Sequence, residues 1–157
     1  MIYLGLGSNL GDKRGNISRA IGLIAERAGE ALAVSGFYET SPWGFESKES
    51  FINAALGIST GLTPEDLLSC TRQIERDMGR TGKSTDGVYH DRIIDIDILL
   101  YDDMVMHSSA LVIPHPLLHC RLFVLQPLAE IAPDLIHPLL GKSIAEILKT
   151  VGELEKK

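Results

Sequence analysis

The sequence lacks the features of a secreted, membrane-bound or nucleic-acid-binding protein. It contains two cysteines, Cys70 and Cys120, in no metal-binding or redox spacing, so we expect no disulfide framework and a cytoplasmic location. No apolar run approaches the ~20 residues of a membrane span, and no signal peptide is recognisable at the N-terminus. Because 21 acidic residues outnumber 15 basic ones, the net charge of −6 argues against general nucleic-acid binding.

The composition that is present is ordinary for a globular protein. Hydrophobic residues make up 45% and charged residues 23% of the 157 residues. A chain of this length buries enough surface on folding that it needs no disulfide bond or structural metal for stability. We therefore expect a single domain across residues 1–157, acting as a monomer without a nucleic-acid or membrane partner.

Residues 92–101 are the most informative stretch, because hydrophobic and acidic residues alternate there as in a strand. The apolar members that share one face are Ile94, Ile96, Ile98 and Leu100. Asp95 and Asp97 share the other face, about 6–7 Å apart at the backbone. Two adjacent carboxylates repel each other, so a lysine, an arginine or a metal ion should lie close to them.

The remaining periodicities predict the fold. The expected strands are 2–6, 34–40, 51–60, 93–101 and the short 112–113, and the expected helices are 17–28, 64–78, 121–129 and 144–151. Residues 41–50 and 81–91 are polar and are predicted to be loops. The order β-α-β-β-α-β predicts an α+β, ferredoxin-like split βαβ fold, with an antiparallel sheet, helices on one face and a C-terminal extension.

Two glycine-containing segments imitate phosphate-binding motifs. The spacing of Gly5, Gly7 and Gly11 is one residue too long for a dinucleotide fingerprint, so a turn that leads into a helix is the better interpretation. The segment 82–84 has the sequence Gly-Lys-Ser, but Asp77 occupies the position of the leading P-loop glycine. We reject both motifs.

The acidic pair has two readings, solvated acids on an open sheet face or a Mg²⁺ site with substrate phosphates. Three arginines, Arg80, Arg92 and Arg121, lie near turns and near His115, and together they resemble an anion clamp rather than scattered surface charges. Regular strand parity directs Arg92 away from the acids, so we expect an irregularity where that strand begins.

Other candidate residues have equally ordinary alternatives. Phe51 and Phe123 are by default core residues, but Phe51 shares a predicted strand face with Asn53, which suits a flat heterocycle that stacks and hydrogen-bonds. That odd-numbered face, which also carries the two acids, is predicted to be a site rather than a second core. Glu75 is interpreted as a surface residue or as a partner that orients Arg80.

Several motifs occur along the chain in the order found in one enzyme family. They are Gly7-Ser8-Asn9-Leu10-Gly11, Phe37-Tyr38-Glu39-Thr40, Phe51-Ile52-Asn53-Ala54, Glu75 with Gly79-Arg80, Arg92-Ile93-Ile94-Asp95-Ile96-Asp97, and Pro114-His115 through Arg121 and Phe123. The chain resembles 6-hydroxymethyl-7,8-dihydropterin pyrophosphokinases, which transfer pyrophosphate from ATP to a pterin alcohol in folate biosynthesis.

The resemblance implies a role for each matched residue. Asp95 and Asp97 would hold two Mg²⁺ ions with the ATP phosphates, and Arg80 and Arg92 would act in catalysis. The implied ATP-binding residues are Glu75, Arg80, Arg92, His115 and Arg121. The implied pterin-binding residues are Thr40, Ser41, Pro42, Trp43, Phe51, Asn53, Asp95 and Phe123. The segments 43–50 and 81–91 would be the lids of the site.

The chain departs from the family pattern at Phe51, where tyrosine is frequent, and at Tyr89 and His90-Asp91, where tryptophan and Gly-Pro are frequent. These changes concern lid closure and adenine contact. Two rival hypotheses come from other classes. One is a non-catalytic ferredoxin-like module that senses a small molecule or binds RNA, and the other is a nucleotide hydrolase or a kinase that transfers the γ-phosphate.

Overall fold

The computed structural model describes residues 1–40, 50–79 and 93–155. Its main sheet contains β1 (Ile2–Ser8), β2 (Gly29–Val34), β3 (Tyr38–Thr40), β4 (Phe51–Thr60) and β5 (Asp95–Tyr101). The strand order is β2-β4-β1-β5, with β3 also paired to β4, and the pairings are antiparallel. With α1 (Lys13–Arg27) and α2 (Pro64–Asp77) as crossovers, this is the predicted ferredoxin-like fold, which is confirmed.

Local sequence signals fix where the two crossover helices begin and end. The Asp12 side chain accepts a hydrogen bond from Gly15 N and caps α1, so this helix begins before its first buried residue, Ile17. Thr63 caps α2 in the same way, and Pro64 occupies its first turn, as predicted. Gly79 ends α2 with a φ of 101°, a left-handed conformation that favours glycine.

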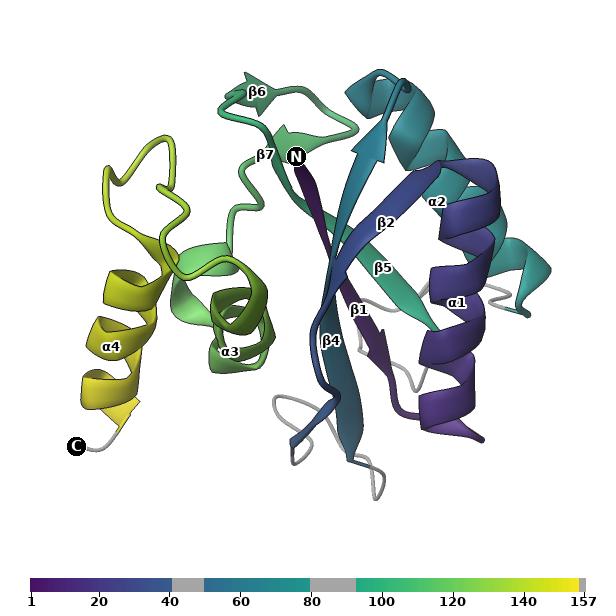
Figure 1. The fold of residues 1–157 in the computed structure, drawn as a ribbon, viewed down its shortest axis with the longest axis horizontal. Helices are drawn as coiled ribbons and strands as arrows, with labels where there is room; N and C mark the ends of the chain where they lie inside the picture. Colours follow the sequence, from purple (N-terminus) through teal and green to yellow (C-terminus); the bar gives the residue numbers. More distant parts are fainter. Residues whose placement is uncertain (41–49, 80–92, 156–157) are drawn as a thin grey trace.

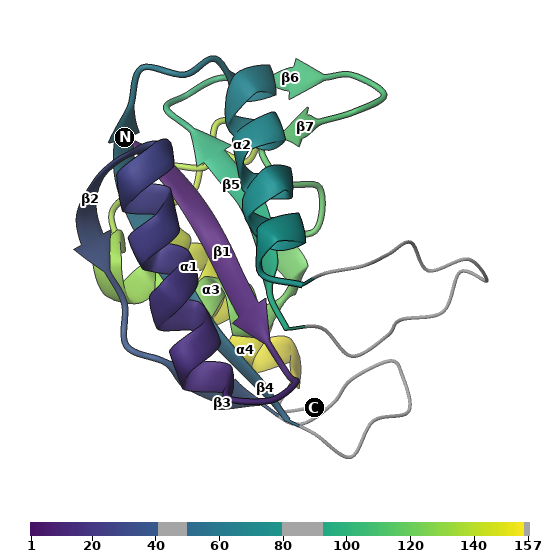
Figure 2. The same ribbon diagram turned by 90° about the vertical axis from the view of Figure 1, so that its right-hand side faces the viewer.

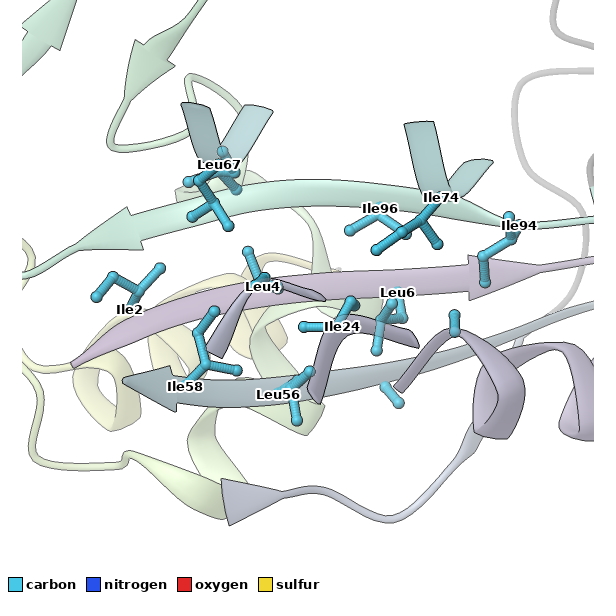
Figure 3. Packing of buried hydrophobic residues seen from close by; sticks show 14 of the residues in the cluster. Ile2, Leu4, Leu6, Ile24, Leu56, Ile58, Leu67, Ile74, Ile94 and Ile96 are labelled. Atoms are coloured by element: carbon cyan, nitrogen blue, oxygen red, sulfur yellow. The ribbon is translucent and has the colours of Figure 1, made fainter. Parts of the chain in front are cut away.

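The first core lies between the sheet and these two helices. In Figures 1 and 2, α1 and α2 lie side by side on one face of the sheet. Leu4 of β1, Leu56 of β4 and Ile96 of β5 project from that face toward Ile24 and Ile74 of the helices (Figure 3). This matches the side of the predicted strands that alternation assigned to the helices.

The C-terminal extension covers the opposite face with helices. It consists of the hairpin β6 (Met106–His107) and β7 (Val112–Ile113), the 3₁₀ helix η1 (Leu118–Cys120), α3 (Leu122–Ile131) and α4 (Ile144–Glu155). Figure 1 shows α3 and α4 on the side of the sheet away from α1 and α2. The second core there includes Tyr3, Ala55, Leu99, Leu125, Leu128 and Ile144. The expectation that this face carries no second core was therefore wrong.

The predicted strand 34–40 was also wrong, because two strands cover this region. β2 starts directly after α1, and a Cβ on Gly29 would lie 2.0 Å from the Ser59 carbonyl oxygen, so glycine permits this close pairing. The Ser35 hydroxyl accepts a hydrogen bond from Ala55 N at 2.8 Å. This side chain takes the place of a backbone partner where β2 ends, before β3 begins at Tyr38.

A β-bulge in β5 changes the face of its last residues. Leu4 pairs with Ile98 and Tyr3 pairs with Leu100, so Leu99 is the extra residue. Leu100 consequently joins the second core instead of the face shared by Ile96 and Ile98, which corrects its predicted orientation. The irregularity expected at Arg92 lies outside the described residues.

Within residues 1–40, 50–79 and 93–155, none of the helices is long and apolar enough to cross a membrane. Both cysteines are free thiols.

Candidate active site

A cavity on the α3 side of the sheet brings together the predicted pterin residues that the structure describes. It is lined by Gly5, Leu6, Gly7, Thr40, Phe51, Asn53, Ala54, Asp95, Asp97, Leu99, Arg121, Phe123 and Val124. Phe51 and Asn53 come from β4, whereas Phe123 lies in the first turn of α3. The Asn53 amide donates to the Thr40 hydroxyl at 3.4 Å, and most of Asn53 is buried. We call this space the first cavity.

Two glycines of β1 form the floor of the first cavity, and the sequence analysis did not identify this role. Gly7 pairs with Asn53 on one side and with Asp95 on the other, and Gly5 pairs with Asp97. Because neither glycine has a side chain, the sheet face between the amide and the acids stays open. Gly5 and Gly7 alternate with Leu4 and Leu6 along the strand, and this pattern could have indicated a strand face without side chains.

We expect Gly7→Ala to weaken binding of the ligand in the first cavity. The added Cβ would lie 2.9 Å from Asn53 Oδ1, so the amide would have to move. Overpacking of this kind costs ~1–3 kcal/mol, which corresponds to an increase of about 5- to 150-fold in the KM of that substrate. Gly22→Ala on α1, where no atom lies within 4 Å of the added Cβ, is the control. Unchanged kinetics in Gly7→Ala would contradict the assignment of the floor.

A second cavity opens beside the first and shares Asp97 with it. Its lining residues are Leu68, Arg72, Ile96, Asp97, Ile98, Ser108, Ser109, Ala110, Leu111, Val112, His115 and Pro116. The wall opposite α2 comes from the hairpin β6–β7 and the segment that follows it. Two ligands bound in these cavities would therefore meet at Asp97.

Asp97 has strongly perturbed electrostatics. Burial and, to a smaller extent, the neighbouring carboxylates of Asp95 and Glu75 together raise its pKa to about 7, although Arg72 and Arg121 act in the opposite direction. A carboxylate with this surplus of negative charge is stabilised by a cation. Within the described part of the chain, no three His, Cys, Asp or Glu residues are arranged to hold a metal by themselves. Two carboxylates completed by substrate phosphates are nevertheless the ligand set that Mg²⁺ uses in many enzymes.

Glu75 is buried, with 1% of its surface exposed, so its interpretation as a surface residue was wrong. Its Oε2 accepts a hydrogen bond from Ile96 N at 2.8 Å, and its Oε1 accepts one from Arg72 Nη1 at 3.0 Å. Because Ile96 lies between the two aspartates, Glu75 fixes the backbone that carries them. Arg72 was missed by the sequence analysis, although its position three residues before Glu75 on a helix was a usable signal.

His115 and Arg121 supply hydrogen-bond donors to the two cavities, His115 to the second and Arg121 to the first. Burial and the nearby Arg121 lower the pKa of His115, although Asp95 acts in the opposite direction. His115 Nδ1 accepts a hydrogen bond from Leu117 N at 3.2 Å, so the neutral ring carries its proton on Nε2 and can donate it. The Arg121 guanidinium lies 5.5 Å from the centre of the Phe123 ring and also lines the first cavity.

Five of the predicted site residues lie outside the described residues. They are Ser41, Pro42, Trp43, Arg80 and Arg92. The two predicted lids, 43–50 and 81–91, fall there as well, apart from Ser50. Their predicted roles remain predictions.

The chain is similar to known proteins along most of its length. Residues 3–133 match the family described as 7,8-dihydro-6-hydroxymethylpterin-pyrophosphokinase. The 2-amino-4-hydroxy-6-hydroxymethyldihydropteridine pyrophosphokinase of Porphyromonas gingivalis is 50% identical over 139 residues, which cover 88% of this chain and 94% of that protein. The enzyme of the same name from Aquifex aeolicus is 42% identical over 145 residues, which cover 92% of this chain and 88% of that protein.

A solved structure supports the fold. The crystal structure of a Plasmodium falciparum HPPK-DHPS triple mutant with STZ-DHP matches 99% of this chain with a TM-score of 0.78 and 18% sequence identity. This chain spans 43% of that longer chain. At this level of identity the match supports the architecture alone.

Proposed function

The chain belongs to the 7,8-dihydro-6-hydroxymethylpterin-pyrophosphokinase family, and from this premise we propose how its two cavities serve the reaction. The reaction moves pyrophosphate from ATP to the hydroxymethyl group of 6-hydroxymethyl-7,8-dihydropterin, giving AMP and the pterin diphosphate in folate biosynthesis. The observation that carries our proposal is that the two cavities meet at Asp97. One cavity takes the acceptor, the other takes the nucleotide, and the transferred group crosses between them.

The first cavity holds the pterin. Its flat ring lies over the glycine floor and stacks between Phe51 and Phe123, while Asn53 hydrogen-bonds to its edge with Thr40 beside it. The aromatic faces supply apolar contact, and the amide supplies both donor and acceptor atoms. Ser41, Pro42 and Trp43 extend the pterin site in this proposal, on the family resemblance alone.

The second cavity holds ATP, with its phosphates toward the acids. His115 Nε2 and the guanidinium groups of Arg72 and Arg121 are the described donors suited to phosphate oxygens. Arg80 and Arg92 complete the clamp on the resemblance. We assign Glu75 a positioning role, through Ile96 N, instead of the direct contact with ATP that the resemblance implied.

Asp95 and Asp97 are the residues that would hold two Mg²⁺ ions with the ATP phosphates. These ions supply charge neutralisation and a template for in-line displacement. The protein contributes a rigid strand that keeps both carboxylates on one face, and it aims the pterin hydroxymethyl oxygen at the β-phosphorus. Arg121 and its neighbours stabilise the negative charge that develops on the transferred group.

We further propose that residues 1–157 form one pyrophosphokinase domain, which acts as a monomer in the cytoplasm. The continuity of α3 and α4 with the sheet through the second core supports a single domain. Size-exclusion chromatography with light scattering tests the monomer. Two isolated free thiols support the cytoplasmic assignment.

One assay tests the reaction. Purified protein is incubated with ATP, Mg²⁺ and 6-hydroxymethyl-7,8-dihydropterin, and the products are separated. We expect AMP and the pterin diphosphate in equal amounts. ADP as the product would favour the γ-phosphate kinase or hydrolase, and an absence of turnover would favour the non-catalytic sensor.

Phe123→Ala tests the stacking role. Loss of one aromatic face should raise the dissociation constant for the pterin about 10- to 50-fold, because base–aromatic stacking contributes ~1–3 kcal/mol. ATP affinity should change little. Phe123→Leu, which keeps apolar bulk without a ring, is the matched variant and should behave like Phe123→Ala. Equal losses of pterin and ATP affinity would reject the role.

A further inference from the structure

Glu130, at the far end of α3 from the substrates, links this helix to the opposite wall of the first cavity. Gly36 N donates to its two carboxylate oxygens at 3.1 and 3.0 Å, and the Tyr38 hydroxyl donates to Oε1 at 2.5 Å. The hydrogen bond to Glu130 raises the pKa of the Tyr38 phenol, which is expected when the ionised form would face a carboxylate. Short hydrogen bonds to an ionised carboxylate are among the strongest that neutral donors form.

Both partners in this set of hydrogen bonds belong to elements that carry proposed pterin-binding residues. Glu130 follows Phe123 by seven residues, so the two side chains lie on the same face of α3, about 10 Å apart along the helix. On the other side, Tyr38 pairs with Asn53, and Thr40 of the same short strand pairs with Phe51. The link therefore connects the helix that carries one aromatic wall to the strand pair that carries the other wall.

We propose that Glu130 is a positioning residue that sets the gap between the two aromatic walls and thereby the affinity for the pterin ring. This inference rests on the assignment of the first cavity to the pterin. Because α3 is rigid, hydrogen bonds at Glu130, two turns from Phe123, restrict the orientation of the helix. They therefore also restrict the orientation of the Phe123 ring over the cavity floor. A displacement of about 1 Å in such a group is enough to weaken a stacked complex markedly.

The test uses Glu130→Ala, Glu130→Gln and Tyr38→Phe in the full chain. We expect Glu130→Ala to raise the pterin KM about tenfold, with kcat and the ATP KM changed by at most about twofold. Glu130→Gln keeps an oxygen that accepts from Gly36 N and should give an intermediate pterin KM. In the Glu130→Ala background, Tyr38→Phe should add little, because the two residues act through one hydrogen bond.

Glu153→Ala, which removes an exposed carboxylate from α4, controls for the change in charge. An unchanged pterin KM in Glu130→Ala, even with a lowered melting temperature, would overturn the proposal, because the contact would then serve stability alone. Equal increases in both KM values would also overturn it. Wild-type AMP formation and the Phe123→Ala titration test the pterin assignment separately, so failure of the positioning role is distinguishable from failure of the proposed function.

Discussion

Asp97→Asn is expected to lower the turnover number at least about 1,000-fold while the fold is retained, since the variant loses a negative charge that the proposed mechanism uses to hold Mg²⁺. Asp97 is the residue common to the two cavities, so in the proposed arrangement its carboxylate would lie where the phosphates and the acceptor meet. Asn has nearly the same size and keeps one oxygen, so packing is preserved. Steady-state kinetics with a Mg²⁺ titration measures the loss. A variant with full activity would refute the metal assignment for this residue.

The same substitution should stabilise the metal-free protein. In the unfolded chain an aspartate has a pKa of ~3.9, whereas in the folded protein that of Asp97 is raised to about 7. Between these two values the folded state binds more protons than the unfolded state, so stability falls as pH rises through this interval. Each unit of pKa difference corresponds to about 1.4 kcal/mol. At pH 8 the ionised Asp97 therefore lowers the free energy of unfolding of the wild-type protein by the full amount, whereas Asp97→Asn has no such loss.

Melting temperatures from pH 4 to pH 8 in the presence of EDTA test this expectation. The wild-type curve should fall below that of Asp97→Asn as the pH increases toward 7. Addition of Mg²⁺ with a non-hydrolysable ATP analogue should stabilise the wild type more than the variant. Parallel curves throughout the range would contradict the raised pKa.

Glu75→Ala has the second-largest expected effect on activity. Without the carboxylate, Ile96 N loses its partner in the core and Arg72 loses its ion pair. An unsatisfied buried N–H group costs ~1–3 kcal/mol of stability. Residues that position metal ligands through hydrogen bonds typically contribute about 10–100-fold to activity or metal affinity. We therefore expect the turnover number to fall by about that factor and the Mg²⁺ concentration needed for activity to rise.

Glu75→Gln separates the geometric role of this side chain from its charge. The amide oxygen can still accept from Ile96 N, so the backbone between the two aspartates should stay in place. We expect this variant to keep most of the activity, within about tenfold of the wild type. Equal losses in the Ala and Gln variants would show that the negative charge, and not the hydrogen bond to Ile96, is what matters.

The sequence predicted those parts of the fold that depend on local signals. The strand from Phe51 to Thr60 and the start of α2 at Pro64 agree with the structure, because side-chain alternation and helix capping act over a few residues. Asp95 and Asp97 share a strand face for the same local reason. The family was also recognisable, because its motifs are short stretches of sequence.

Three features could not be derived this way. The bulge at Leu99 arises from how β5 pairs with β1, so alternation alone gave Leu100 the wrong face. The second core exists because α3 and α4 fold back over a sheet face whose residues come from earlier in the chain. The strand break near Ser35 depends on its hydrogen bond to Ala55, twenty residues away.

By itself, the sequence determined the α+β architecture, the pair of acids on one strand face and the family. Only the tertiary structure decided that Glu75 is a buried support for Ile96, that Gly5 and Gly7 form a cavity floor, and that Glu130 connects to Tyr38. The reason is that these roles rest on contacts between distant residues, 21 positions apart for Glu75 and Ile96 and 92 for Glu130 and Tyr38. Periodicity gives the face on which a side chain lies, whereas the packing of whole elements determines what that side chain meets.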